Sequence, residues 1–183
     1  MIDGGKDWGY ELRDDRHRKV LVWSKNPWSA VDQIGSPDLP PGRFVAGTTQ
    51  TPQGDVRVIG VCIPWQSAHT NTCHKNRKNW EDHERYLTHL APLLKVGTTP
   101  LVVAGDFNQR IPRGRQPQRM YDALMNTFEG LAVSTVQTEA PTLIDHIAHS
   151  PNLCAESLTI IPDIDELGKL SDHRGAVVKF ALA

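Results

Sequence analysis

The sequence has little of what marks the specialised protein classes. Its 183 residues include only 3 cysteines, too few for a disulfide-stabilised scaffold. Lys and Arg number 20 against 21 Asp and Glu, so the formal net charge of −1 indicates no particular class of binding partner. The 14 glycines and 13 prolines follow no period, which excludes a collagen-like chain. An apolar share of 39% predicts a single globular domain over residues 1–183 and excludes a disordered chain.

Long hydrophobic runs are also missing. No stretch of about 18 apolar residues is present, so we expect no membrane span. The first twenty residues are polar and mixed in charge, without the apolar segment of a secretory signal. The cysteines, Cys62, Cys73 and Cys154, are odd in number and scattered, which favours a reducing compartment. We therefore expect a cytoplasmic protein, and no motif predicts a protein partner.

Apolar runs and turn residues predict both strands and helices. Strands are expected at residues 20–23, 43–49, 56–63, 100–104, 143–148, 157–161 and 175–182, with the turn TPQGD joining the second and third as a hairpin. Apolar side chains at helical spacing predict helices over 79–94, with Trp80 on the core-facing side, and over 120–127. Residues 1–17, 65–78 and 163–169 are expected to be irregular. The mixture predicts an α/β (α+β) layered domain with a mixed sheet.

Ionisable residues follow or lie within strand-like runs at three places: GDFN (105–108), IDH (144–146) and SDHR (171–174). Strand ends are where rigid scaffolds place functional groups. Taken singly, each segment also fits a structural role, such as a turn, a helix cap or a solvated loop. The occurrence of all three, each beside an apolar run, favours a functional site.

The residue types in these segments suit phosphoryl transfer. Asp106 and Asp172 are hard oxygen donors for Mg²⁺ or Mn²⁺, and Asn108 offers an uncharged amide. His173 could hydrogen-bond a phosphate oxygen while Asp145 holds its imidazole in one tautomer. A carboxylate would accept the proton of the attacking water.

A basic rim could bind the substrate phosphates. Arg77, Arg113 and Arg115 are the candidate contacts, and Arg113 and Arg115 lie just after the GDFN segment. Trp65 and Trp80 could stack on bases, although the helical spacing of Trp80 favours a place in the core. The alternative interpretation is that these residues lie in solvated loops.

Five segments of the chain resemble the endonuclease/exonuclease/phosphatase superfamily. LVVAGDFNQR (101–110), LIDHIAHS (143–150) and LSDHRGAVVKF (170–180) are similar to its GDxN, IDxI and SDH segments, in the same order. RKVLVWSKNPW (18–28) and RVIGVCIPWQSAH (57–69) resemble its intervening strands. The resemblance implies a four-layered α/β sandwich of two mixed sheets flanked by helices, the DNase I-like fold. It also implies Mg²⁺- or Mn²⁺-dependent hydrolysis of phosphoester bonds in nucleic acid or another phosphoester.

The resemblance assigns a role to each motif residue. Asp106 would orient or deprotonate the attacking water and contact the metal, and Asn108 would bind the scissile phosphate. Asp172 would help hold the metal, and His173 would contact the phosphate with Asp145 orienting it. A nuclease or other phosphodiesterase is the first hypothesis. The alternatives are an inositol- or lipid-type phosphomonoesterase and a non-catalytic, truncated member of the fold.

The chain departs from the family pattern at its start. The family begins with a strand carrying an Asn and a second strand carrying a metal-binding Glu. Only residues 1–17 precede the segment 18–28, and none of them matches either strand. Glu11 has no apolar strand before it and is interpreted as a surface residue. We therefore expect an N-terminally incomplete domain with an exposed sheet edge.

Overall fold

One mixed β-sheet forms the centre of the molecule. The computed structural model describes residues 1–6, 14–70, 76–136 and 143–183. Six strands pair in the order β3-β4-β5-β6-β8-β7, and all neighbours are antiparallel except β5 and β6, which run parallel. Their bounds are Trp28–Asp32 (β3), Phe44–Thr51 (β4), Gly54–Cys62 (β5), Leu101–Asp106 (β6), Ala132–Val133 (β7) and Asp145–His149 (β8). The expected mixed α+β class and the hairpin of β4 and β5 are confirmed.

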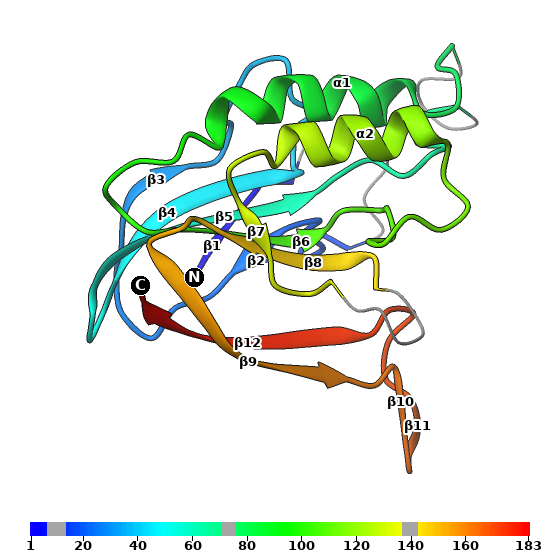
Figure 1. Ribbon diagram of the computed structural model, residues 1–183. Helices are drawn as coiled ribbons and strands as arrows, with labels where there is room; N and C mark the ends of the chain where they lie inside the picture. Colours follow the sequence, from blue (N-terminus) through cyan, green and yellow to red (C-terminus); the bar gives the residue numbers. More distant parts are fainter. Residues whose placement is uncertain (7–13, 71–75, 137–142) are drawn as a thin grey trace.

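Two helices cover one face of this sheet (Figure 1). They are α1, Glu81–Leu90, which a 3₁₀ turn at Ala91–Leu93 continues, and α2, Gln118–Thr127. The buried apolar and imidazole side chains of α1 recur at helical spacing: His83, Tyr86, Leu87 and Leu90. One side of the helix therefore faces the sheet, as the apolar spacing predicted.

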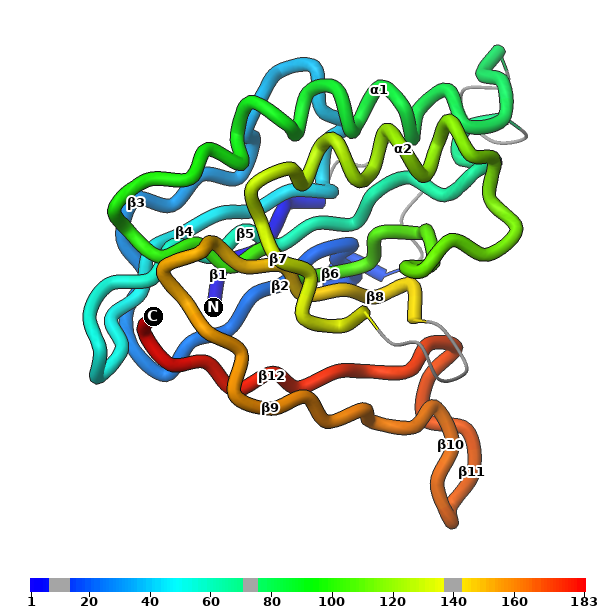
Figure 2. The backbone as a smooth tube through the Cα atoms, viewed as in Figure 1, coloured from blue at the N-terminus to red at the C-terminus, as the bar shows by residue number. Residues whose placement is uncertain are grey.

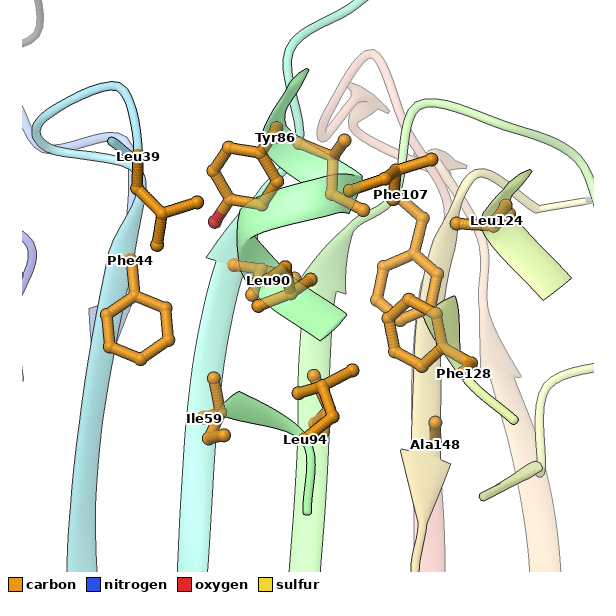
Figure 3. Close-up of a cluster of buried hydrophobic side chains, with 14 of the residues drawn as sticks. Leu39, Phe44, Ile59, Tyr86, Leu90, Leu94, Phe107, Leu124, Phe128 and Ala148 are labelled. Carbon is orange, nitrogen blue, oxygen red and sulfur yellow. The ribbon is translucent and has the colours of Figure 1, made fainter. Parts of the chain in front are cut away.

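The main hydrophobic core lies between the helices and the sheet (Figure 3). Phe107, which follows Asp106 directly, is completely buried and stacks on Phe128 with the ring centroids 4.5 Å apart. Tyr86 is also completely buried, and its hydroxyl donates to the carbonyl oxygen of Arg43 at 2.7 Å. Burial of aromatic rings contributes strongly to core energetics. The packing of Phe107 thus fixes the chain at the point where β6 ends.

The other face of the sheet carries two separate two-stranded ribbons (Figures 1 and 2). In one, β1 (Ile2–Asp3) pairs with β2 (Leu21–Val22); in the other, β9 (Leu153–Ile161) pairs with β12 (Gly175–Leu182). Within the described ranges the two ribbons share no strand pairing. The second of the two expected sheets is therefore represented by two narrow ribbons.

The layers follow the order helices, large sheet, ribbons (Figure 1). The ring of Phe180 on β12 contacts His149 on β8 with a centroid distance of 5.0 Å, which joins one ribbon to the large sheet. In the part of the chain that the structure describes, both helices lie on the face of the large sheet opposite to the ribbons. The outer face of the ribbons therefore has no helix layer in this part of the chain. None of the described helices is long and apolar enough to cross a membrane.

Several short strands lie where the sequence predicted irregular structure. The range 163–169 contains a small hairpin of β10 (Ile164–Asp165) and β11 (Gly168–Lys169). The expected irregular range 1–17 contains β1, and β3 lies between the expected strands 20–23 and 43–49, where no strand was expected. Strands of two residues are too short to show alternation, and they form because a partner strand lies beside them. Glu11 lies outside the described residues.

Candidate active site

The end of β6 positions the first carboxylate. Gly105, just before the terminal residue Asp106, has a φ of 143°. A Cβ at position 105 would lie 2.0 Å from the carbonyl oxygen of Val61 on β5. Only glycine permits two backbones to approach so closely in this conformation. The close approach of β5 and β6 therefore fixes where the side chain of Asp106 leaves the sheet.

Asn108 anchors the carboxylate of Asp106. Its backbone N–H donates to Oδ1 at 2.8 Å, and its side-chain Nδ2 donates to Oδ2 at 2.7 Å. The same Nδ2 donates to the carbonyl oxygen of Ile63 at 2.8 Å. Asn108 has a φ of 52°, a left-handed conformation that asparagine adopts more readily than most residues. The predicted pair Asp106 and Asn108 thus forms one rigid unit at the end of the sheet.

Two further predicted residues lie beside Asp106. Asp145 begins β8 and stands opposite Asp106 in the strand register. The Nδ1 atom of His173, from the segment before β12, lies 2.8 Å from Oδ2 of Asp145. Ligand atoms of Asp106, Asp145 and His173 all lie within 4.8 Å of one another. Three residues from distant parts of the sequence therefore form one cluster, which we call the acidic cluster.

Burial raises the pKa of both carboxyl groups of the acidic cluster. Burial raises the pKa of Asp106 to about 6, and the charge of Asp145 adds to the rise. The hydrogen bond from Asn108 and the nearby His173 and Arg43 act in the opposite direction. Burial also raises the pKa of Asp145, although the contact with His173 opposes this. A carboxyl group that titrates near neutral pH is suited to accept a proton in a reaction.

The acidic cluster fits a hard divalent cation. Two partly buried carboxylates side by side need a positive partner, because each raises the free energy of ionising the other. Mg²⁺ is usually held by one or two carboxylates together with waters, and Mn²⁺ has similar oxygen preferences. The donor atoms of Asp106 and Asp145 are of this kind. The residues present thus match the ion that the family resemblance implies.

Asp172 was expected at the metal but lies outside the acidic cluster. Its side chain is 81% exposed, and its Oδ2 lies 3.9 Å from Nε2 of His173. The imidazole therefore has Asp145 near one ring nitrogen and Asp172 near the other. Asp145 supplies the second carboxylate of the cluster, and contact between Asp172 and a metal stays a prediction.

The three arginines of the predicted basic rim lie in different settings. Arg77 forms ion pairs with two acidic residues of α1, at 2.8 and 3.3 Å. Arg113 donates to the backbone carbonyl of the residue three positions along, at 3.1 Å. Arg115 lines a cavity of about 500 Å³ that Asn108 also borders. Of the three, Arg115 shares a cavity with a residue of the candidate site.

Two residues near the site have positions that the sequence did not reveal. Arg43 is buried, and its Nη1 donates to the carbonyl oxygen of Cys62 at 3.2 Å and to its Sγ at 3.3 Å. A lone arginine before a strand carries no recognisable signal, yet its charge lowers the pKa of Asp106. The expectation that Trp80 lies in the core is wrong. It caps α1 with a left-handed φ of 71° and lines the same cavity as Arg115.

Comparison with known proteins places the chain in a family. A sequence profile of the Endonuclease/Exonuclease/phosphatase family matches residues 4–173. The chain belongs to this family. No curated protein sequence matches it.

Solved structures of this family share the fold. An endonuclease/exonuclease/phosphatase from Beutenbergia cavernae is 18% identical, with a TM-score of 0.56 over 87% of this chain and 46% of that one. The 3′ phosphatase NExo from Neisseria, bound to a product DNA hairpin, is 20% identical, with a TM-score of 0.60 over 86% of this chain and 73% of that one. The human Nocturnin catalytic domain with bound sulfate is 18% identical, with a TM-score of 0.56 over 86% of this chain and 60% of that one. The chain thus spans about half to three quarters of the length of these family members.

Two buried histidines hold the loop that follows Asn108 in this family member. Nδ1 of His83 on α1 donates to the carbonyl oxygen of Pro64 at 2.6 Å. Nε2 of the same neutral ring therefore carries no hydrogen, and it accepts from Nε2 of Gln109 at 2.7 Å. The Nε2 of His146 on β8 lies 3.1 Å from the carbonyl oxygen of Gln109. Burial lowers the pKa of both imidazoles to about 4. Both rings are therefore neutral at pH 7 and tie Gln109 to a helix and a strand.

Acid is expected to destabilise the domain through these two histidines. Their folded-state pKa of about 4 lies below the usual 6.5, so the unfolded chain binds more protons between these values. The stability that these rings contribute is therefore fully present above pH 6.5 and is lost as the pH drops toward 4, by about 2.5 kcal/mol for each ring at pH 4.5. Asp106 has the opposite shift and offsets part of the loss. Urea unfolding at pH 7 and pH 4.5 measures the difference.

His83→Gln isolates the contribution of one of the two buried rings. Removal of His83 should make the stability fall less between pH 7 and pH 4.5, even though the variant is less stable at pH 7. An unchanged slope in His83→Gln would show that this imidazole is not buried in its neutral form.

Proposed function

We propose that this chain hydrolyses phosphodiester bonds of nucleic acid in a reaction that needs Mg²⁺ or Mn²⁺. The observation that carries the proposal is the acidic cluster, in which Asp106, Asp145 and His173 meet at the end of the large sheet. Membership of a family of phosphoester hydrolases supports it. The DNA product bound to the similar Neisseria 3′ phosphatase supports nucleic acid as the substrate.

Each residue of the acidic cluster has a distinct task in the proposed reaction. Asp106 would accept a proton from the attacking water and is held for this by Asn108. His173 donates a hydrogen bond to a phosphate oxygen through Nε2, because Asp145 holds Nδ1. Asp106 and Asp145 would hold a divalent cation, which would supply positive charge to stabilise the developing negative charge on the phosphate.

Neighbouring residues complete the proposed phosphate site. A cavity of about 290 Å³ borders His173 and is also lined by Arg110, Arg174 and Asp172. The guanidinium group of Arg110 would bind phosphate oxygens, because planar arginine matches phosphate geometry. Arg174, whose Nε lies 3.2 Å from Oδ1 of Asp163, would add its remaining donors. Asp172 remains the predicted additional acidic contact to the cation. Arg113 and Arg115 extend the positive charge along the loop that follows Asn108.

Hydrolysis of a labelled oligonucleotide tests the proposal directly. Purified protein with Mg²⁺ or Mn²⁺ should cleave the internal phosphodiester bonds of a fluorescent single-stranded oligonucleotide, and chelation with EDTA should stop cleavage. Asp145→Ala and His173→Ala should each lower the rate about 100-fold or more, the usual contribution of a positioned proton-transfer or phosphate-binding group. Asp55→Asn, which removes an exposed carboxylate from a hairpin, is the matched control and should cleave normally.

Three outcomes would contradict the proposal. Cleavage that persists in EDTA would remove the cation from the reaction. Release of inorganic phosphate from a 3′-phosphorylated oligonucleotide, with its internal bonds intact, would identify a phosphomonoesterase on the same site. The absence of any turnover, together with no Mg²⁺ or Mn²⁺ binding in calorimetry, would identify a non-catalytic member of the family.

A further inference from the structure

A cavity next to the acidic cluster is lined by two tryptophans and two arginines. It has a volume of about 500 Å³, and Trp65, Trp80, Arg110, Arg115 and Asn108 are among its lining residues. We call it the tryptophan cavity. Its size is within the range of clefts that hold small ligands. Through Asn108 it borders the unit that anchors Asp106.

The two indole rings are held at this cavity by local structure. Trp65 follows the fully buried Ile63 by two residues and is 50% exposed, so the sheet positions it without burying it. The backbone N–H of Trp80 donates to the carbonyl oxygen of Gln66 at 2.6 Å, which ties the two tryptophan segments together. Trp80 itself keeps a left-handed φ of 71° instead of joining the core. A tryptophan in this conformation is strained, and such strain concentrates at ligand sites.

The ring of Trp80 also has a fixed neighbour. It meets the ring of His83 edge to face, with centroids 5.0 Å apart and planes at 80°. His83 is buried and contacts the carbonyl oxygen of Pro64. The orientation of Trp80 therefore depends on a side chain that cannot move freely. A fixed aromatic face is what stacking on a ligand requires, because little conformational entropy is lost on binding.

The arginines of the cavity carry charge that the described part of the chain does not neutralise. Neither Arg110 nor Arg115 forms an ion pair with an acidic residue in the described ranges. Their loop is braced by Gln116, whose Nε2 donates to the carbonyl oxygen of Arg110 at 2.6 Å and whose Oε1 accepts from Gly114 at 2.9 Å. Two guanidinium groups are thus held on an ordered loop beside two indole faces. This combination suits a ligand that has both a flat ring and a phosphate.

The tryptophan cavity continues into the proposed phosphate site. Arg110 and Ile144 line both this cavity and the 290 Å³ cavity that contains His173. A ligand can therefore extend from Trp65 past Arg110 to His173. A nucleotide has this shape, because its base and its phosphate are separated by one sugar.

We propose that the tryptophan cavity binds an unpaired nucleobase of a single-stranded polynucleotide, next to the phosphodiester bond that is cleaved. The base stacks on Trp65, with Trp80 as the second aromatic wall, and Arg110 and Arg115 contact the adjoining phosphates. This inference rests on the proposed function for the position of the scissile bond. It also names the substrate class, because an inositol phosphate has no aromatic face and a base inside a duplex cannot enter a cavity.

Binding in the absence of metal tests the inference separately from catalysis. Fluorescence anisotropy of labelled octathymidylate and octauridylate in EDTA gives a Kd without hydrolysis. Trp65→Ala should weaken binding of at least one of the two oligonucleotides by about tenfold, the effect of losing one base stack. Trp65→Phe keeps an aromatic face and should stay within about threefold of the natural chain. Weakened binding of either oligonucleotide supports the inference.

Three matched comparisons separate stacking from general effects. An octamer of abasic sugar phosphates should bind equally to the natural chain and to Trp65→Ala, because it has no base to stack. Arg115→Ala should weaken binding and lower the salt dependence of the Kd, while Arg16→Ala, an exposed arginine remote in sequence, should change neither. Leu167→Ala controls for loss of an exposed apolar side chain.

The results distinguish the two proposals. Equal binding of both oligonucleotides by Trp65→Ala and the natural chain would overturn the base-binding inference even if the protein cleaves DNA or RNA. An equal loss for the abasic octamer would overturn it as well. Base-dependent binding that depends on Trp65 would support the inference even if no hydrolysis is found.

Discussion

Replacing Gly105 with alanine is expected to prevent stable folding. The new Cβ would lie 2.0 Å from the carbonyl oxygen of Val61, and the backbone φ of 143° is one that alanine rarely adopts. The Cβ is fixed by the backbone of residue 105 and its neighbour is a backbone carbonyl, so no side-chain rotation relieves the contact. We expect a loss of more than about 4 kcal/mol in the free energy of unfolding, which is at the extreme of single substitutions. Soluble yield and urea unfolding of the purified variant measure it.

Gly97→Ala is the matched control for this prediction. Gly97 is exposed, and a Cβ there would meet no atom within 4 Å. We expect its stability to stay within about 1 kcal/mol of the natural chain. If Gly105→Ala unfolded at the same urea concentration as Gly97→Ala, the backbones of β5 and β6 could not approach as closely at Gly105 as the structure shows. The position of Asp106 at the strand end would then need another explanation.

Local sequence patterns predicted the elements that bury apolar side chains. The apolar runs and the turn at 43–63 predicted the β4–β5 hairpin, and helical spacing predicted α1 and α2. The apolar run before GDFN predicted β6. These elements are long enough for their periodicity to appear in the sequence. The short strands β1, β7, β10 and β11 have two residues each and depend on distant partners, so no local pattern marks them.

The motifs predicted that Asp106, Asp145 and His173 lie together, but not the contacts that each of them makes. Asp106 and Asp145 share a face because their strands pair in register, and the order of the motifs could not show that register. Asp172 and His173 are neighbours in sequence, yet the imidazole reaches Asp145 while the carboxylate of Asp172 stays exposed. Arg77 forms ion pairs with acidic residues on α1, and which partners it has depends on the tertiary structure. Trp80 fits the helical spacing but lies just before the helix begins.

Asp106→Asn is expected to abolish hydrolysis and, above pH 6, to stabilise the fold. The amide cannot accept a proton from water, so the rate should fall by about 100-fold or more. Burial is the main reason that the pKa of Asp106 is raised to about 6 from the usual 3.8. Because the folded state binds this proton more tightly than the unfolded chain, stability falls as the pH rises through 6. Removing the charge should therefore restore up to about 3 kcal/mol at pH 8.

Part of this gain is offset by a lost hydrogen bond. Nδ2 of Asn108 donates to Oδ2 of Asp106, and an amide nitrogen at that position would face another donor, at a cost of about 1 kcal/mol. The net gain at pH 8 is thus about 2 kcal/mol, which raises the melting temperature by several degrees for a domain of this size. At pH 4.5 the gain should vanish, because Asp106 is then protonated in the natural chain.

Thermal unfolding at both pH values, with Asp55→Asn as the exposed carboxylate control, measures this opposition between activity and stability. Asp55→Asn should change neither the rate nor the melting temperature. An Asp106→Asn protein that is inactive and equally stable at pH 8 would mean that the carboxylate is well solvated in the free chain. A variant that is more stable but fully active would assign proton transfer to another group. Inactivity together with added stability at pH 8 is the result expected of a buried charge retained for its chemistry.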